Sequence, residues 1–161
     1  MPRPTSAGIL LFRRTAATRR LELLLGHPGG PYFAAKDAGH WTIPKGETDG
    51  DGDFLRVARR EFEEETGHAP PVGPVVELGS IVQKGGKTVH AWAIEGDLDP
   101  AACHSNTFET EWPPRSGRRI SAPEIDRVEW FDPDEARRRI KPTQIPLLDR
   151  LEAALATDGG D

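Results

Sequence analysis

A chain of 161 residues has the length of one compact domain and is long enough to bury a core without disulfide bonds. Its 36% hydrophobic and 29% charged residues are ordinary for a folded protein, and no stretch approaches the roughly 18 apolar residues of a membrane-spanning helix. The net charge of −5 disfavours a general nucleic-acid-binding role, which usually requires a basic surface.

The start of the chain and its cysteine content predict a cytoplasmic protein. Met1–Pro4 leads directly into a strand-like segment, without the apolar core and cleavage site of a secretory signal. Cys103 is the single cysteine of the sequence, so an intrachain disulfide is excluded. We expect one domain over residues 1–157 and a flexible tail at 158–161, and the sequence leaves the oligomeric state open.

The first part of the chain predicts a β-hairpin followed by a loop. Thr5–Phe12 and Leu21–Gly26 are rich in aliphatic residues and can pair across the polar connection between them. A Pro-Gly-Gly-Pro run within residues 27–39 predicts a loop. Trp41–Ile43 is then a short extended piece that ends at Pro44.

Asp53–Thr66 is the clearest predicted helix. An aspartate at position 51 or 53 can cap its start, and Gly67 can end it. At roughly 100° per residue, the apolar side chains gather on the side that faces the core. These core-facing residues are Leu55, Ala58 and Phe62, with Phe54 beside them.

The second half of the chain predicts three strands and two helices around a long polar stretch. Asp97–Pro123 has little periodicity, and unstructured segments of this length in small domains are usually functional or disordered. The predicted strands are Val75–Gln83, Thr88–Glu95 and Arg127–Phe131, and the predicted helices are a short one capped by Asp132 and an amphipathic one over Gln144–Ala156.

Three glutamates lie side by side on one flank of the 53–66 helix. Glu61, Glu64 and Glu65 are spaced i, i+3 and i+4, and like charges at i, i+4 destabilise a helix by about 0.2–0.5 kcal/mol per pair. A hard divalent cation prefers carboxylate oxygens and would relieve this repulsion. The alternative is a solvated acidic face.

Gly46 precedes Arg60 and Glu61 by 14 and 15 residues, and Gly67 follows the glutamates. This spacing resembles the Nudix box, G-x5-E-x7-R-E-U-x-E-E-x-G-U, in which U is an apolar residue. Pro44–Glu47 also resembles the usual lead-in to that motif. Two positions depart from it: Gly52, flanked by Asp51 and Asp53, stands in place of the first glutamate, and His68 replaces the last apolar residue. The positions that match are Gly46, Arg60, Glu61, Phe62, Glu64, Glu65 and Gly67.

The resemblance implies the Nudix fold, an α/β fold with a mixed β-sheet sandwiched between helices and a catalytic loop-helix-loop. It places the Asp53–Thr66 helix on one face of the sheet and the Gln144–Ala156 helix on the other. It also implies a pyrophosphohydrolase whose Mg²⁺ or Mn²⁺ is held by the metal ligands of the box, with Arg60 orienting them. By resemblance these ligands are Glu61, Glu64, Glu65 and the carbonyl of Gly46.

The general base and the substrate contacts stay open at this stage. A box glutamate or Glu124 can serve as the base, with Glu109 and Glu111 as alternatives. Contacts to a small-molecule nucleotide are expected from basic or aromatic side chains, although each can also be an ordinary solvated residue. The candidates for these contacts are Lys45, Tyr32, Arg115 and Arg118.

Dinucleoside polyphosphates and nucleoside triphosphates are the favoured substrates, and ADP-ribose, nucleotide sugars and 5'-triphosphorylated RNA are alternatives. Gly52 favours a different class of protein, a non-catalytic nucleotide-binding or regulatory module. A calcium-binding EF-hand loop starting at Asp49 is rejected, because its sixth and twelfth positions are Phe54 and Arg60 rather than glycine and glutamate.

Overall fold

The computed structural model describes residues 5–15, 20–48 and 52–158. Its strands are β1 (Thr5–Arg14), β2 (Leu21–Pro28), β3 (Lys45–Glu47), β4 (Val75–Val82), β5 (Thr88–Glu95), β6 (Thr107–Glu111), β7 (Arg119–Pro123) and β8 (Ile125–Phe131). Its helices are α1 (Phe54–Thr66), α2 (Pro133–Arg139) and α3 (Ile145–Asp158), with single 3-10 turns at Pro100–Ala102 and Pro142–Gln144. In the part of the chain described, no helix is both long and apolar enough to cross a membrane.

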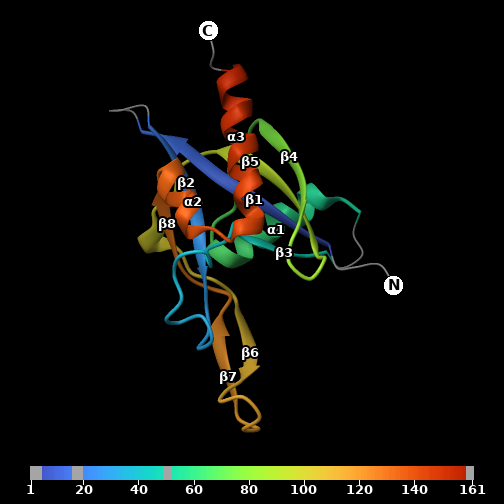
Figure 1. The fold of residues 1–161 in the computed structure, drawn as a ribbon, viewed down its shortest axis with the longest axis vertical. Helices are drawn as coiled ribbons and strands as arrows, with labels where there is room; N and C mark the ends of the chain where they lie inside the picture. The colour runs from blue at the N-terminus through green and yellow to red at the C-terminus, as the bar shows by residue number, and fades with distance from the viewer. Residues whose placement is uncertain (1–4, 16–19, 49–51, 159–161) are drawn as a thin grey trace.

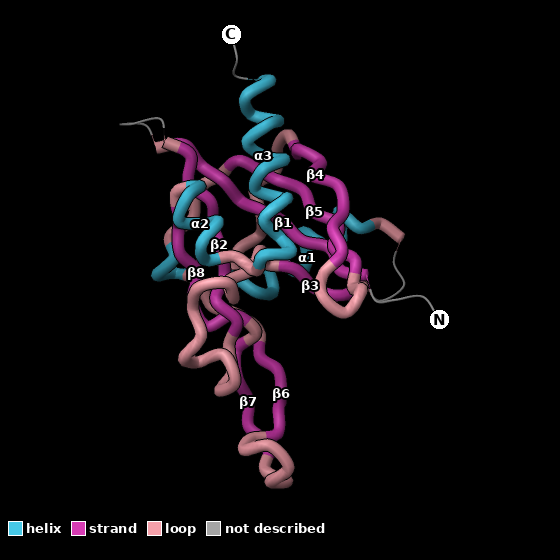
Figure 2. Tube along the Cα trace, viewed as in Figure 1, coloured by secondary structure: helices cyan, strands magenta, loops and turns pink. Residues whose placement is uncertain are grey.

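Six strands form one mixed sheet, as predicted. The order is β4-β5-β1-β2-β8, with β3 paired to β1 beside this path. The central strand β1 is antiparallel to β2, which confirms the predicted hairpin, and parallel to β5. Helix α1 covers one face of the sheet, whereas α3 and α2 lie on the other (Figures 1 and 2).

The alternating side chains of β1 divide the core between these two faces. Leu10 and Phe12 point into the cluster that contains the leucines of α3. Ile9 and Leu11 point into the cluster that contains Phe62 of α1. This period of two is expected for a strand that is covered on both sides, and it confirms the predicted placement of the two helices.

Helix α1 begins and ends as the sequence predicts, but its buried side is shifted. The Asp53 carboxylate accepts a hydrogen bond of 3.1 Å from the backbone N–H of Arg56, and Gly67 ends the helix in the left-handed conformation at φ 80°. Val57, Ala58 and Phe62 are fully buried, whereas Leu55 is only half-buried. The buried stripe is thus centred on Val57 and Ala58 rather than on Leu55.

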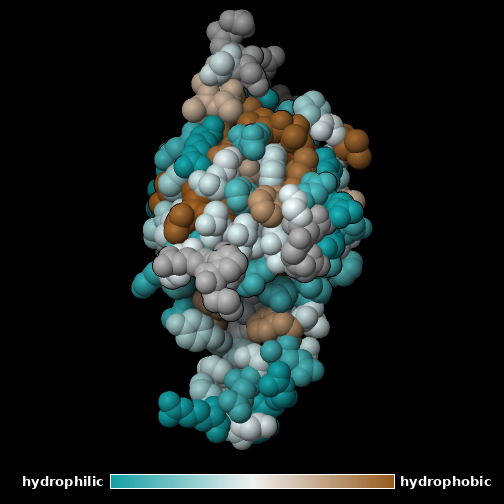
Figure 3. All heavy atoms as spheres, turned by 90° about the vertical axis from the view of Figure 1, so that its right-hand side faces the viewer, coloured by the Kyte–Doolittle hydropathy of each residue, from teal (hydrophilic) through white to brown (hydrophobic). Residues whose placement is uncertain are grey.

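The polar stretch between β5 and β8 contains a β-hairpin that the sequence analysis missed. Strands β6 and β7 pair over five positions, from Thr107↔Pro123 to Glu111↔Arg119. The hairpin projects from the main body (Figure 1), and its far end is hydrophilic (Figure 3). Its larger apolar side chains, Phe108 and Ile120, are only half-buried, so they leave a weak alternation in the sequence.

Two smaller differences concern the lead-in segment and the end of the chain. Lys45–Glu47 is a strand rather than a loop, because its backbone pairs with Ser6–Gly8 of β1. Helix α3 continues to Asp158, two residues beyond the predicted end. The remainder of the predicted tail, 159–161, lies outside the described residues.

Candidate active site

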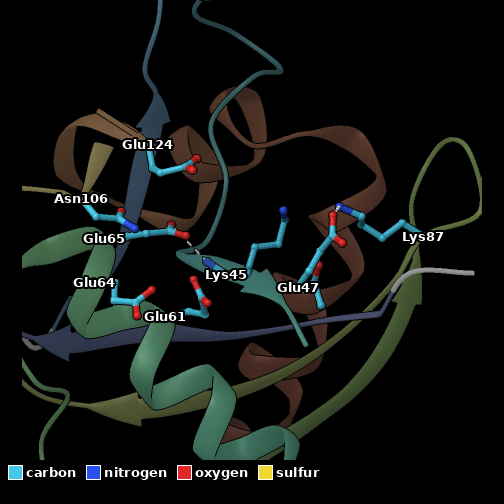
Figure 4. A pocket seen from close by; sticks show the side chains of 10 residues that line it. Lys45, Glu47, Glu61, Glu64, Glu65, Lys87, Asn106 and Glu124 are labelled. Atoms are coloured by element: carbon cyan, nitrogen blue, oxygen red, sulfur yellow. Dashed lines mark hydrogen bonds and ion pairs between the residues drawn. The ribbon is translucent and has the colours of Figure 1, made fainter. Parts of the chain in front are cut away.

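A cavity of about 400 Å³ opens where α1, β3 and the start of β8 meet (Figure 4). It has a carboxylate side, made by α1 and Glu124, and a lysine side, made by β3 and the start of β5. Its lining residues are Ser6, Lys45, Gly46, Glu47, Glu61, Glu64, Glu65, Lys87, Asn106 and Glu124.

The backbone at Gly46 leaves no room for a side chain. A Cβ atom built on Gly46 would lie 2.1 Å from the Oε2 and Cδ atoms of Glu61. The pairing of β3 with β1 fixes the backbone there, with Gly46 opposite Ala7. The glycine therefore lets the carboxylate of α1 lie directly against the strand.

Glu65 and Lys45 form the buried floor of the cavity. Glu65 is 7% exposed and accepts a hydrogen bond of 3.3 Å from the backbone N–H of Lys45 at its Oε1 atom. Burial raises the pKa of Glu65 to about 8, against the opposing charge of Lys45. Burial also lowers the pKa of Lys45 to about 8, helped by the nearby positive charges of Lys141 and Lys87.

Glu61 and Glu64 complete the carboxylate side, with Arg60 beside them. Burial raises the pKa of Glu61, and the negative charge of Glu64 adds to this shift. The Arg60 guanidinium lies 3.6 Å from Glu61 and 3.9 Å from Glu64, at partly exposed positions where ion pairs are weak. The role predicted for Arg60, to orient these carboxylates, remains a prediction.

The chemistry of this donor set fits a hard divalent cation. Each glutamate offers carboxylate oxygens, and Ser6 adds a fully buried hydroxyl oxygen that has no hydrogen-bond partner in the described part of the chain. Within residues 5–15, 20–48 and 52–158, no three acidic, histidine or cysteine side chains are already gathered at a metal-binding spacing. The carboxylates therefore line one cavity without meeting at one point, and the metal-ligand set remains a prediction.

Residues 104–106 bring Glu124 to this cavity. Their backbone runs beside the end of α1, because the N–H of Asn106 donates to the carbonyl of Glu64 at 2.8 Å. The N–H of Glu124 donates in turn to the carbonyl of Asn106 at 2.9 Å. Glu124 thereby faces the box glutamates across the opening (Figure 4).

The alternative bases lie on the projecting hairpin, outside the lining of the cavity. Glu109 pairs with Arg119 at 3.2 Å. Glu111 accepts hydrogen bonds from the backbone N–H groups of Arg115 and Gly117, at 3.1 and 2.9 Å, and so holds the hairpin turn. The structure therefore favours Glu124 among the three candidates.

Three of the predicted substrate contacts also lie away from the cavity lining. Arg115 and Arg118 are exposed in the turn of the hairpin. Tyr32 is 65% exposed and packs edge-on against Phe33, with the Lys36 ammonium 5.1 Å from its ring centre. Only Lys45 of the four candidates lines the cavity. Contacts from the other three would require a substrate that extends beyond it.

The one described candidate to replace the missing first glutamate of the box, Asp53, does not do so. Gly52 faces open space. Asp53, one of the two proposed substitutes, uses its carboxylate to cap α1. The other, Asp51, lies outside the described residues.

Several lining residues were missed because only the fold brings them here. Ser6 and Lys87 reach the cavity through the pairing of β1 with β3 and β5, and Lys87 donates to Glu47 at 2.9 Å. Asn106 arrives through backbone bonds to α1. No local motif marks these positions, although Glu47 belongs to the lead-in segment that resembles the Nudix pattern.

A mixed sheet between helices, with a loop-helix-loop that lines a carboxylate cavity, defines the class of Nudix domains. The model of that family, described as NUDIX domain, matches residues 2–151, so this chain belongs to the Nudix family. The predicted Nudix pyrophosphohydrolase is thereby confirmed for family, fold and enzyme class.

Solved structures share the fold at low sequence identity. The NUDIX domain of Shewanella oneidensis NrtR complexed with ADP ribose has a TM-score of 0.67 and 15% identity, covering 96% of this chain and 90% of that domain. A Caenorhabditis elegans Ap4A hydrolase binary complex has a TM-score of 0.64 and 22% identity, covering 96% and 98%. A mutT/nudix family protein from Listeria innocua has a TM-score of 0.64 and 17% identity, covering 99% and 98%. A comparison with curated proteins found no match.

Proposed function

We propose that this chain hydrolyses a phosphoanhydride bond in a nucleoside diphosphate-linked compound and requires Mg²⁺ or Mn²⁺. Dinucleoside polyphosphates and nucleoside triphosphates are the favoured substrates. The observation that carries this proposal is that Glu61, Glu64 and Glu65 line one cavity. Gly46 leaves room there for the Glu61 carboxylate, which a Cβ atom at this position would displace.

The residues of the cavity divide the chemistry between its two sides. A bound divalent cation supplies charge neutralisation for the phosphates and a more acidic water. Glu61, Glu64, Glu65 and the Gly46 carbonyl would hold that cation. Glu124, which faces these glutamates across the opening, would accept a proton from the attacking water. Lys45 points into the space between them, where it can bind a phosphate oxygen.

The test is a hydrolysis panel of dinucleoside polyphosphates, nucleoside triphosphates, ADP-ribose and nucleotide sugars, with Mg²⁺, Mn²⁺ or a chelator. We expect metal-dependent release of a nucleoside phosphate, and product masses in ¹⁸O-labelled water locate the attacked phosphorus. Glu64→Gln should lower kcat by about 100-fold or more. Glu63→Gln is the matched control, because Glu63 is exposed one position away on α1 and does not line the cavity.

An uncut panel, or a Glu64→Gln variant with full activity, would contradict this proposal. The second candidate is a non-catalytic nucleotide-binding module, which Gly52 favours because Asp53 caps α1 rather than taking over from the missing glutamate. That candidate expects tight nucleotide binding without turnover and no gain from Gly52→Glu. The hydrolase proposal expects turnover in the parent protein before any change at position 52.

A further inference from the structure

Two further cavities, one smaller and one larger, neighbour the carboxylate cavity. Past Glu65 and Glu124, a cavity of about 160 Å³ is lined by both Lys45 and Lys141. Lys141 also lines the next cavity, of about 490 Å³, together with Lys84. The first of these cavities shares three wall residues with the carboxylate cavity, and the second shares Lys141 with the first. We call the two cavities that contain Lys141 the lysine branch.

The lysine branch contains positive charge that the described protein does not pair. Lys45 and Lys141 are half-buried, and their ammonium groups make no ion pair or hydrogen bond within residues 5–15, 20–48 and 52–158. Lys87, by contrast, is paired with Glu47. Half-buried ammonium groups close to one another are costly unless an anion joins them.

The backbone of Lys141 is held in place, so the unpaired charge does not belong to a loose loop. Its N–H donates to the carbonyl of Trp41 at 2.8 Å, and its carbonyl accepts from the N–H of Gln144 at 2.8 Å. Trp41 is fully buried and donates its own N–H to the carbonyl of Arg139 at 2.9 Å. The fold thus fixes the backbone that carries this cation at the wall of both cavities.

We propose that the lysine branch binds a phosphate group beyond the diphosphate that lies at the carboxylates. This inference rests on the proposed function, because it takes the position of that diphosphate from it. It predicts selection for substrates with three or more consecutive phosphates. ADP-ribose and nucleotide sugars place an uncharged sugar in the branch, which leaves Lys141 unpaired.

Glu124, and Glu65 once it is ionised, also line the branch and repel an anion. Binding of the extra phosphate is therefore expected to need both the lysines and a divalent cation at the carboxylates. A phosphate that pairs with two ammonium groups gains charge-assisted hydrogen bonds, and losing one such bond usually costs about ten- to hundredfold in affinity.

The test compares two non-hydrolysable nucleotides by titration calorimetry in Mg²⁺. One is an ATP analogue with both bridging oxygens replaced by methylene, and the other is α,β-methylene-ADP, which lacks the third phosphate. Lys141→Met, which keeps the apolar stem, should weaken binding of the ATP analogue about tenfold and change binding of the ADP analogue less than about twofold. Lys141→Arg should restore most of the loss.

The matched control is Lys36→Met, a lysine that lines none of the three cavities and should leave both affinities unchanged. A thermal melt establishes that each variant is folded.

Equal loss of affinity for both analogues, or no loss for the ATP analogue, overturns the proposal that the lysine branch binds a phosphate. If the hydrolysis panel is uncut but Lys141→Met still acts selectively, the branch stands and the hydrolase proposal falls. If ADP-ribose is cut as efficiently as the polyphosphates and Lys141→Met is neutral, the hydrolase stands and the branch falls.

Discussion

At Gly46 the backbone of β3 passes so close to α1 that the carboxylate of Glu61 occupies the place of a side chain. We predict that Gly46→Ala lowers kcat/KM by about 100-fold, because a displacement of about 1 Å at a catalytic group has an effect of that size. Steady-state kinetics measure the loss. Gly52→Ala is the matched control, since a Cβ there meets nothing within 4 Å, and it should keep full activity. Equal activity of both variants would show that Glu61 can move without consequence.

Glu65 gives the predicted metal affinity a pH dependence. Its pKa is raised from 4.5 to about 8 by burial, so the folded, metal-free protein keeps this proton throughout that interval. Because the unfolded chain releases the proton near pH 4.5, the free energy of unfolding of the metal-free protein falls as pH rises from 4.5 to about 8. A cation needs the ionised carboxylate, so its binding must displace the proton.

We therefore predict that Mg²⁺ affinity rises with pH up to about 8 and then levels off. Below that value the rise approaches about tenfold per pH unit for each proton displaced. Calorimetry at pH 7 in two buffers with different ionisation enthalpies counts the protons released, and we expect about one, from Glu65. A Mg²⁺ affinity that does not change between pH 6 and 8 would exclude Glu65 as a ligand that carries its proton in the free protein.

At the scale of elements, the start of α1 shows which of two possible roles Asp53 has, that of helix cap or that of a site carboxylate. Asp53 caps the helix, whereas the sequence also allowed it to replace the missing box glutamate. We predict that Asp53→Asn keeps both stability and activity, because asparagine caps a helix as well as aspartate does. Asp53→Ala should lower the free energy of unfolding by about 1 kcal/mol. Urea denaturation measures stability, and steady-state kinetics measure kcat. If Asp53→Asn keeps its stability but loses kcat, the negative charge of Asp53 takes part in the active site.

Elements with a buried side were predictable, and the hairpin was not. The apolar periodicity of β1 and α1 reports directly on burial, and the cap at Asp53 and the glycine at Gly67 mark the ends of the helix. Strands β6 and β7 bury little on either side, so the pattern that identifies strands is weak there. The Glu61, Glu64 and Glu65 group was predictable because one helix carries it, whereas Lys141 depends on the packing of residues far apart in the chain.

At the scale of the whole molecule, one buried glutamine joins the C-terminal layer to the segment that leads into the site. Gln144 is fully buried just before α3. Its Oε1 accepts from the backbone N–H of Ile43 at 3.1 Å, and its Nε2 donates to Thr42 Oγ1 at 2.9 Å and to Gln83 Oε1 at 3.0 Å. Ile43 lies two residues before Lys45, so these bonds support the strand that carries Lys45 and Gly46.

We predict that Gln144→Met, which nearly keeps the volume, lowers the free energy of unfolding by about 1–3 kcal/mol, because it leaves the N–H of Ile43 buried without an acceptor. Urea denaturation of the metal-free protein measures this loss. Gln83→Met is the matched control: it removes only one of the three bonds, at a half-buried position, and should cost less than about 1 kcal/mol. If the two variants are equally stable, the bond to Ile43 does not hold the two layers together. If Gln144→Met is less stable and also has a higher KM with kcat unchanged, the same bonds that join the layers also position Lys45 for the substrate.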